Sequence, residues 1–150
     1  MKVLGKNKGA LYNYEIVKKY EAGIALKGWE VKSIKNSMFN LKDSFIVIRK
    51  GELYITGMHI SRWKTQSKDI ALDNFRERKL LLKRGEIKRL ELEKQRLANS
   101  TIVPLKVYLK GNRIKIEIAL VRGKKKYEKR QALKEKEAKK DIQSKNLNVW

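Results

Sequence analysis

The stretch TIVPLKVYLKGNRIKIEIALV, residues 101–121, contains two alternating runs of apolar residues separated by a Gly111-Asn112 turn. The apolar positions are Val103, Leu105, Val107 and Leu109 before the turn, and Ile114, Ile116, Ile118 and Leu120 after it. Alternation with a period of two is typical of strands with one buried face, and a short Gly-containing turn between two such runs predicts a β-hairpin. Pro104 has no N–H to donate to a ladder, so we expect this strand to lie partly at an edge.

Three further segments carry regular patterns. SFIVIRKGELYITGMHI, residues 44–60, predicts a second hairpin around a Lys50-Gly51 turn. Upstream, apolar residues from Tyr12 to Leu26 keep one parity and predict a single long, curved strand with a bend or bulge at Gly23. Residues 83–100 have apolar side chains near helical spacing and predict a helix of modest length.

These elements predict a mainly β protein. Five or more antiparallel strands with one clear helix, in a small basic chain, favour a closed or partly closed Greek-key barrel of OB type over a sandwich, with residues 1–121 forming the barrel. Residues 122–150 hold 11 basic and 4 acidic side chains and few large apolar ones. Such a segment cannot bury enough apolar surface to offset its ordering entropy, so we expect a tail that is disordered in free solution.

The composition limits the partners. With 38 Lys and Arg against 16 Asp and Glu, the net charge is +22 on 150 residues, and nucleic acid is the leading partner. A membrane surface is the competing partner, but the sequence has no amphipathic helix or apolar run that fits one. The start of the chain has no apolar core of a secretory signal, so we expect a cytoplasmic protein.

Catalytic and metal chemistry find little support in the sequence. There is no Cys, and His59 is the single His, which argues against thiolate or His-based metal sites and catalytic triads. Asp69 and Asp73 are the nearest candidates for a nuclease metal pair, yet no third ligand is evident. We therefore predict no cofactor, no metal and no enzymatic activity.

Three blocks in order carry a family resemblance: EAGIALKGWEVKSIK at 21–35, RERKLLLKRGEI at 76–87 and VPLKVYLKGNRIKIEIALVRGKKKYEKR at 103–130. Over about residues 7–137 the chain resembles the SsrA-binding protein (SmpB) family. The resemblance implies an OB-like barrel with helices outside it, and a monomer when free. It also implies binding of the tRNA-like domain of transfer-messenger RNA and its delivery to stalled ribosomes in trans-translation. A general RNA-binding OB-fold protein or a ribosome-associated RNA chaperone is the alternative.

The resemblance assigns RNA-binding residues on the barrel, each with an ordinary structural alternative. Glu21 would accept hydrogen bonds from bases or ribose hydroxyls, although a carboxylate at a strand edge can also be merely solvated. Leu81 would pack on an unstacked base or a sugar, although a buried run of leucines leading into a helix is the other interpretation. The remaining members are Asn7, Lys8, Arg76, Arg78, Lys79 and Lys115. Trp29 we interpret as core, and Glu30 as a local partner of Lys27 or Lys32.

The tail resembles the family's ribosome-binding segment, which implies a helix in the messenger channel near the decoding centre. The residues that match are Gly123, Lys124, Lys125, Tyr127, Lys129 and Arg130. Tyr127 and Glu128 replace the usual His and Asp of this motif, which keeps an aromatic face but removes a titratable ring. The solvated tail remains the alternative interpretation.

Overall fold

A computed structural model describes residues 1–62 and 73–123 of the chain. Its elements, in chain order, are β1 (Lys2–Lys6), α1 (Lys8–Asn13), β2 (Tyr14–Ile24), α2 (Gly28–Lys35), β3 (Phe39–Asn40), β4 (Phe45–Arg49), β5 (Glu52–Thr56), β6 (His59–Ile60), β7 (Arg78–Leu81), α3 (Arg84–Arg96), β8 (Ser100–Lys110) and β9 (Arg113–Gly123).

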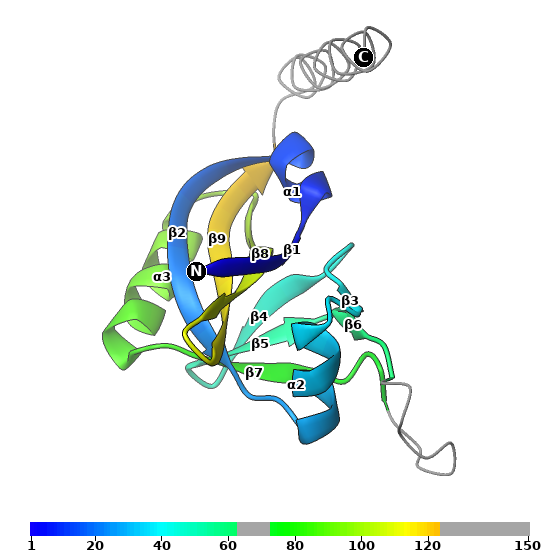
Figure 1. Cartoon of the computed structure of the whole chain (residues 1–150). Helices are drawn as coiled ribbons and strands as arrows, with labels where there is room; N and C mark the ends of the chain where they lie inside the picture. Colours follow the sequence, from blue (N-terminus) through cyan, green and yellow to red (C-terminus); the bar gives the residue numbers. More distant parts are fainter. Residues whose placement is uncertain (63–72, 124–150) are drawn as a thin grey trace, which may run out of the picture.

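The strands close into a barrel, as expected from the sequence. The sheet order is β1-β8-β4-β5-β7-β2-β9, and β8 also pairs with β9, so the strands from β8 to β9 form a ring and β1 adds to the outside of β8. Every pairing is antiparallel. Figure 1 shows α3 outside the curved β2 strand and α2 beside β6 and β7. The prediction of a mainly β, OB-like barrel with a few external helices is confirmed.

Both predicted hairpins are present. Lys50 and Gly51 have positive φ values of 52° and 74°, as a type I′ two-residue hairpin turn requires at both central positions. The β8–β9 hairpin turns at Gly111, whose φ is 63°. The predicted helix between the hairpins is α3. Local turn chemistry and apolar alternation therefore determine these elements in the folded chain.

The long strand predicted from Tyr12 was wrong at both ends. Tyr12 lies in α1, and β2 starts at Tyr14 and ends at Ile24. Gly23 is paired on both sides without a bulge; the irregularity lies between Ile16 and Lys18. Alternation predicts a strand but does not fix its ends, which here are set by the flanking helices, α1 ending at Asn13 and α2 starting at Gly28.

The expected edge is confined to the surroundings of Pro104, because β8 is flanked on both sides over most of its length. Its outer neighbour changes from β4, paired at Ile102, to β1, which starts to pair at Lys106. Pro104 lies between these two stretches and next to a bulge in the β8–β9 pairing. The missing N–H thus falls where neither outer ladder is formed.

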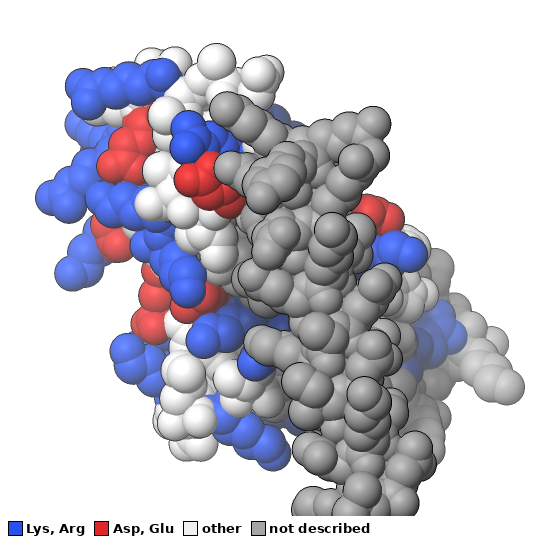
Figure 2. Space-filling view, turned by 90° about the horizontal axis from the view of Figure 1, so that it is seen from above, with Lys and Arg blue, Asp and Glu red and all other residues white. Residues whose placement is uncertain are grey.

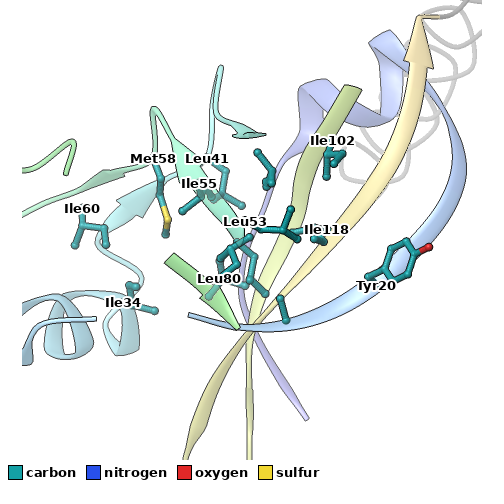
Figure 3. Packing of buried hydrophobic residues seen from close by; sticks show 14 of the residues in the cluster. Tyr20, Ile34, Leu41, Leu53, Ile55, Met58, Ile60, Leu80, Ile102 and Ile118 are labelled. Atoms are coloured by element: carbon teal, nitrogen blue, oxygen red, sulfur yellow. The ribbon is translucent and has the colours of Figure 1, made fainter. Parts of the chain in front are cut away.

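The core fills the barrel and continues under α2. Figure 3 shows Leu53, Leu80 and Ile118 pointing inward from three strands, while Ile34 and Ile60 extend the cluster toward the helix. Trp29 is buried at 9% exposure, as predicted. In contrast, α3 buries only Leu90, so it is a peripheral helix. In the described ranges no helix is long and apolar enough to cross a membrane.

Strand β9 continues to Gly123. The predicted boundary placed Arg122 and Gly123 in the tail, but both belong to the last strand of the barrel. Arg122 pairs with Glu15 of β2 through its Nε, 2.9 Å from Oε2, and through its Nη2, 3.1 Å from Oε1. The rest of the tail lies outside the described residues.

Candidate nucleic-acid interface

Strand pairing gathers three of the predicted RNA-binding residues around Gly23. Gly23 of β2 pairs with Leu81 of β7 on one side and with Lys115 of β9 on the other. Glu21 lies two residues earlier on the same face of β2. We call the surface formed by Glu21, Lys79, Leu81, Lys110 and Lys115 around this glycine the Gly23 patch.

The carboxylate of Glu21 is positioned by two side chains of β8, Tyr108 and Lys110. Its carboxylate accepts a hydrogen bond from the hydroxyl of Tyr108, whose residue is 3% exposed, and lies 3.4 Å from the Nζ of Lys110. The Tyr108 hydrogen bond, with the charges of Lys110 and Lys115, holds the pKa of Glu21 below its ordinary value. Burial and the neighbouring carboxylate raise the pKa of Tyr108. Glu21 is therefore ionised at neutral pH, 41% exposed, and orients Lys110 beside it.

Leu81 and Lys79 face outward on β7. Leu81 is 52% exposed whereas Leu80 is 1% exposed, as period-two alternation requires. The ammonium of Lys79 lies 2.9 Å from Glu52, and this carboxylate raises the pKa of Lys79. Both side chains line a groove of about 510 Å³ whose other cations are Lys50, Arg84 and Lys88. An exposed apolar side chain among cations suits a base or sugar flanked by phosphates.

The same alternation buries Arg78, and the prediction that it contacts phosphate was therefore wrong. Arg78 is fully buried, and its Nε lies 2.6 Å from Oε2 of Glu30. Arg76 is 29% exposed, and its Nη2 also donates to Glu30, at 2.5 Å from Oε1. Leu80 faces the core, and Arg78, two residues earlier on the same strand, faces inward with it.

Glu30 is a buried anchor with more partners than expected. The backbone N–H of Lys27, one of the two predicted neighbours, donates to it at 2.7 Å, but the two arginines are its charged partners. Burial alone would raise the pKa of Glu30, but the hydrogen bonds from Arg76, Lys27 and Arg78 outweigh it and hold the pKa below its ordinary value. The carboxylate is therefore ionised at neutral pH.

Asn7 and Lys8 lie apart from the Gly23 patch. Asn7 ties α1 to β8, because its backbone N–H donates to the carbonyl of Leu105 at 2.7 Å and its side-chain amide to that of Pro104 at 2.9 Å. Lys8 is exposed. Both line a groove of about 780 Å³ that shares no residue with the patch. Their contact with RNA stays a prediction, and for Asn7 an anchoring role is now visible.

Sequence reasoning missed Tyr108 and Lys110. The signal was available in the hairpin, because a two-residue turn at 111–112 pairs Lys110 with Arg113 and Tyr108 with Lys115. Tyr108 and Lys110 then share a face with Lys115, the residue that the resemblance had selected.

Lys and Arg side chains gather along the side of the molecule where Figure 1 places β2 and α3, with acidic side chains between them (Figure 2). In residues 1–62 and 73–123 no three His, Asp or Glu side chains come together as a metal site.

Gly123, the first of the predicted tail residues, is the last residue of β9. The other predicted tail residues, Lys124, Lys125, Tyr127, Lys129 and Arg130, and the Asp69 considered for a metal pair, fall outside the described residues.

Comparisons with known proteins agree on one family. The family model described as SmpB protein matches residues 4–148. A relative from Persephonella marina named SsrA-binding protein is 50% identical over 145 residues, which are 97% of this chain and 94% of the relative. A Staphylococcus epidermidis protein of the same name is 48% identical over 139 residues, covering 93% of this chain and 88% of that one.

The fold agrees with a solved structure. A chain from the work described as "tmRNA-SmpB: a journey to the center of the bacterial ribosome" superposes with a TM-score of 0.68 at 37% identity, covering 89% of this chain and 95% of that chain. The family match spans nearly the whole sequence, and the identity of the relatives is far above what a shared fold alone requires. The chain belongs to the SmpB protein family.

Proposed function

We propose that this protein binds the tRNA-like domain of transfer-messenger RNA and delivers it to stalled ribosomes for trans-translation, which tags the nascent peptide and rescues the ribosome. The observation that carries the proposal is the family match over residues 4–148. The relatives are named SsrA-binding proteins, and the related solved structure joins SmpB with transfer-messenger RNA and the ribosome.

The Gly23 patch is the surface that we assign to the RNA. It offers one carboxylate acceptor, one exposed leucine and three lysines on neighbouring strands. The lysines supply attraction to phosphate that is independent of sequence, whereas Glu21 and Leu81 supply contacts that require an accessible base edge, ribose or base face. A folded RNA with exposed loop nucleotides meets these needs better than a regular duplex does.

In this proposal the barrel binds transfer-messenger RNA and the tail binds the ribosome. The barrel up to Gly123 holds the RNA, and the tail beyond it enters the messenger channel of the small subunit, where Lys124, Lys125, Tyr127, Lys129 and Arg130 contact ribosomal RNA. The tail's positive charge and helix-forming composition support folding on a polyanion. The protein acts as a carrier in the cytoplasm and performs no chemistry itself.

A reconstituted tagging reaction tests the proposal. Ribosomes stalled on a message without a stop codon, supplied with charged transfer-messenger RNA, should add the peptide tag only when this protein is present. Tagging that proceeds equally without it would contradict the delivery role. A general RNA chaperone, the alternative, would bind unrelated RNA equally well and leave tagging dependent on another protein.

A further inference from the structure

The buried guanidinium of Arg78 joins three parts of the chain to the start of β7. Its Nε donates to Glu30 of α2 at 2.6 Å, its Nη1 to the carbonyl of Met58 at 2.6 Å and its Nη2 to the carbonyl of Asn74 at 3.1 Å. Glu30 is itself fully buried. The start of β7 is therefore tied to α2, to the residue before β6 and to the turn that precedes β7.

Stability alone does not explain such a network. A buried ion pair can often be replaced by apolar side chains of similar volume without loss of stability, because desolvation offsets most of the attraction between the charges. What an ion pair with several directed hydrogen bonds adds is geometric: a fork-shaped guanidinium fits one arrangement of acceptors. Buried polar groups of this kind are best known for fixing register.

Strand β7 needs such a constraint, because its sequence does not determine which face is buried. It spans only four residues, with three partners on β5 and two on β2. Leu80, Leu81 and Leu82 follow one another, so leucine occupies both parities. A slip of one residue exchanges the two faces of a strand. A slipped β7 could bury Leu81 in place of Leu80 with little change in apolar burial.

Arg78 removes this ambiguity. In a slipped strand its side chain would leave the interior, and the buried carboxylate of Glu30 would lose the fully buried one of its two arginine partners, which is strongly unfavourable. The ion pair thus favours the one parity in which Lys79 and Leu81 face solvent.

We propose that Glu30, acting through Arg78, is the positioning residue that sets the parity of β7 and so presents Lys79 and Leu81 to RNA. This inference rests on the proposed function for its RNA partner, but the strand parity can be measured without RNA.

The test compares Glu30→Gln with Glu93→Gln. Both variants remove one negative charge, but Glu93 of α3 forms a solvent-accessible ion pair with Lys18 of β2. Affinity for a tRNA-like RNA should fall roughly tenfold for Glu30→Gln relative to the control, about the size of one lost contact to a base. The dependence of affinity on salt should weaken by about one unit as Lys79 loses its phosphate. In a Leu81→Ala background, Glu30→Gln should cost much less affinity than in the unchanged chain.

Amide hydrogen exchange supplies the readout without RNA. In Glu30→Gln the amides of residues 79–81 should lose protection while those of the β8–β9 hairpin keep theirs. Should this variant not fold, Glu30→Leu combined with Arg78→Met, which leaves no buried charge unpaired, takes its place in both measurements. A folded variant with control-level RNA affinity and unchanged protection at 79–81 would overturn the inference. If the unchanged protein failed to bind the tRNA-like RNA, the proposed function would fall, and hydrogen exchange would still decide the role of Glu30.

Discussion

Gly23 of β2 lies opposite Leu81 of β7, and a Cβ on Gly23 would stand 3.3 Å from the Cβ of Leu81. The missing side chain leaves the space in which Leu81 rests on the barrel surface. Replacing Gly23 with Ala should push Leu81 outward by a few tenths of an ångström. Because Leu81 is half exposed, this movement should cost little stability but should weaken binding of the tRNA-like RNA. Melting curves and titrations should be compared with those of Gly28→Ala, whose added Cβ meets nothing within 4 Å. Equal RNA affinity in the two variants would show that the placement of Leu81 is unimportant.

Leu81→Asp should weaken RNA binding through lost apolar contact and repulsion from phosphate, with an unfolding free energy changed by less than about 0.5 kcal/mol, as for other exposed positions. Leu92→Asp is the matched control, since Leu92 is 53% exposed on α3 and lies outside the Gly23 patch. We expect Leu81→Asp to bind RNA more weakly than Leu92→Asp, and the two variants to have similar melting temperatures. A large loss of folding specific to Leu81→Asp would instead favour a core role for this leucine.

Glu21→Ala should affect both stability and binding. Removing the carboxylate leaves the hydroxyl of the buried Tyr108 without its acceptor, which should lower the free energy of unfolding by about 1–3 kcal/mol. Adding Tyr108→Phe should restore much of that stability, because both partners of the hydrogen bond are then absent. RNA affinity should stay low in the double variant, because the carboxylate is still missing. Denaturant unfolding and RNA titrations on the same samples measure the two effects. If RNA affinity recovered together with stability in the double variant, Glu21 would act on binding only through the fold.

Truncation after Lys124 should separate RNA binding from ribosome function. The Gly23 patch and strand β9 remain intact, so specific RNA binding measured at moderate salt should largely survive, with a shallower dependence on salt concentration. Peptide tagging on stalled ribosomes should fail, because the residues assigned to the messenger channel are gone. Tagging at the full-length rate by the truncated protein would support a solvated tail without a role.

The two hairpins, the buried faces of their strands and the fold class were predictable from the sequence, because they depend on local turn chemistry and on alternation. The ends of β2 were not predictable, because they depend on the helices at either side. Helix α1 starts at Lys8 and precedes the strand, and α2, which starts at Gly28 and is capped by the Glu30 carboxylate, follows it. The composition of RERKLLL suggested three surface cations. Only the pairing of β7 shows that Arg78 shares the inward face of Leu80.

The grouping of the site illustrates the same limit. Glu21, Leu81 and Lys115 are distant in sequence, and the family resemblance selected each of them separately. Their meeting at Gly23 depends on closure of the barrel, which brings β7 and β9 to opposite sides of β2. No periodicity within a single segment contains that information.

The most direct measurement of the central claim is a titration of the full-length protein with two RNAs at one moderate salt concentration. One RNA is the tRNA-like domain of transfer-messenger RNA, and the other is an unrelated hairpin of equal length, which controls for the nonspecific attraction of a chain with a net charge of +22. We expect the tRNA-like domain to bind at least about a hundredfold more tightly, and the preference to shrink in Leu81→Asp and Glu21→Ala. Equal affinity for both RNAs would contradict the account and leave a basic barrel that binds RNA without discrimination.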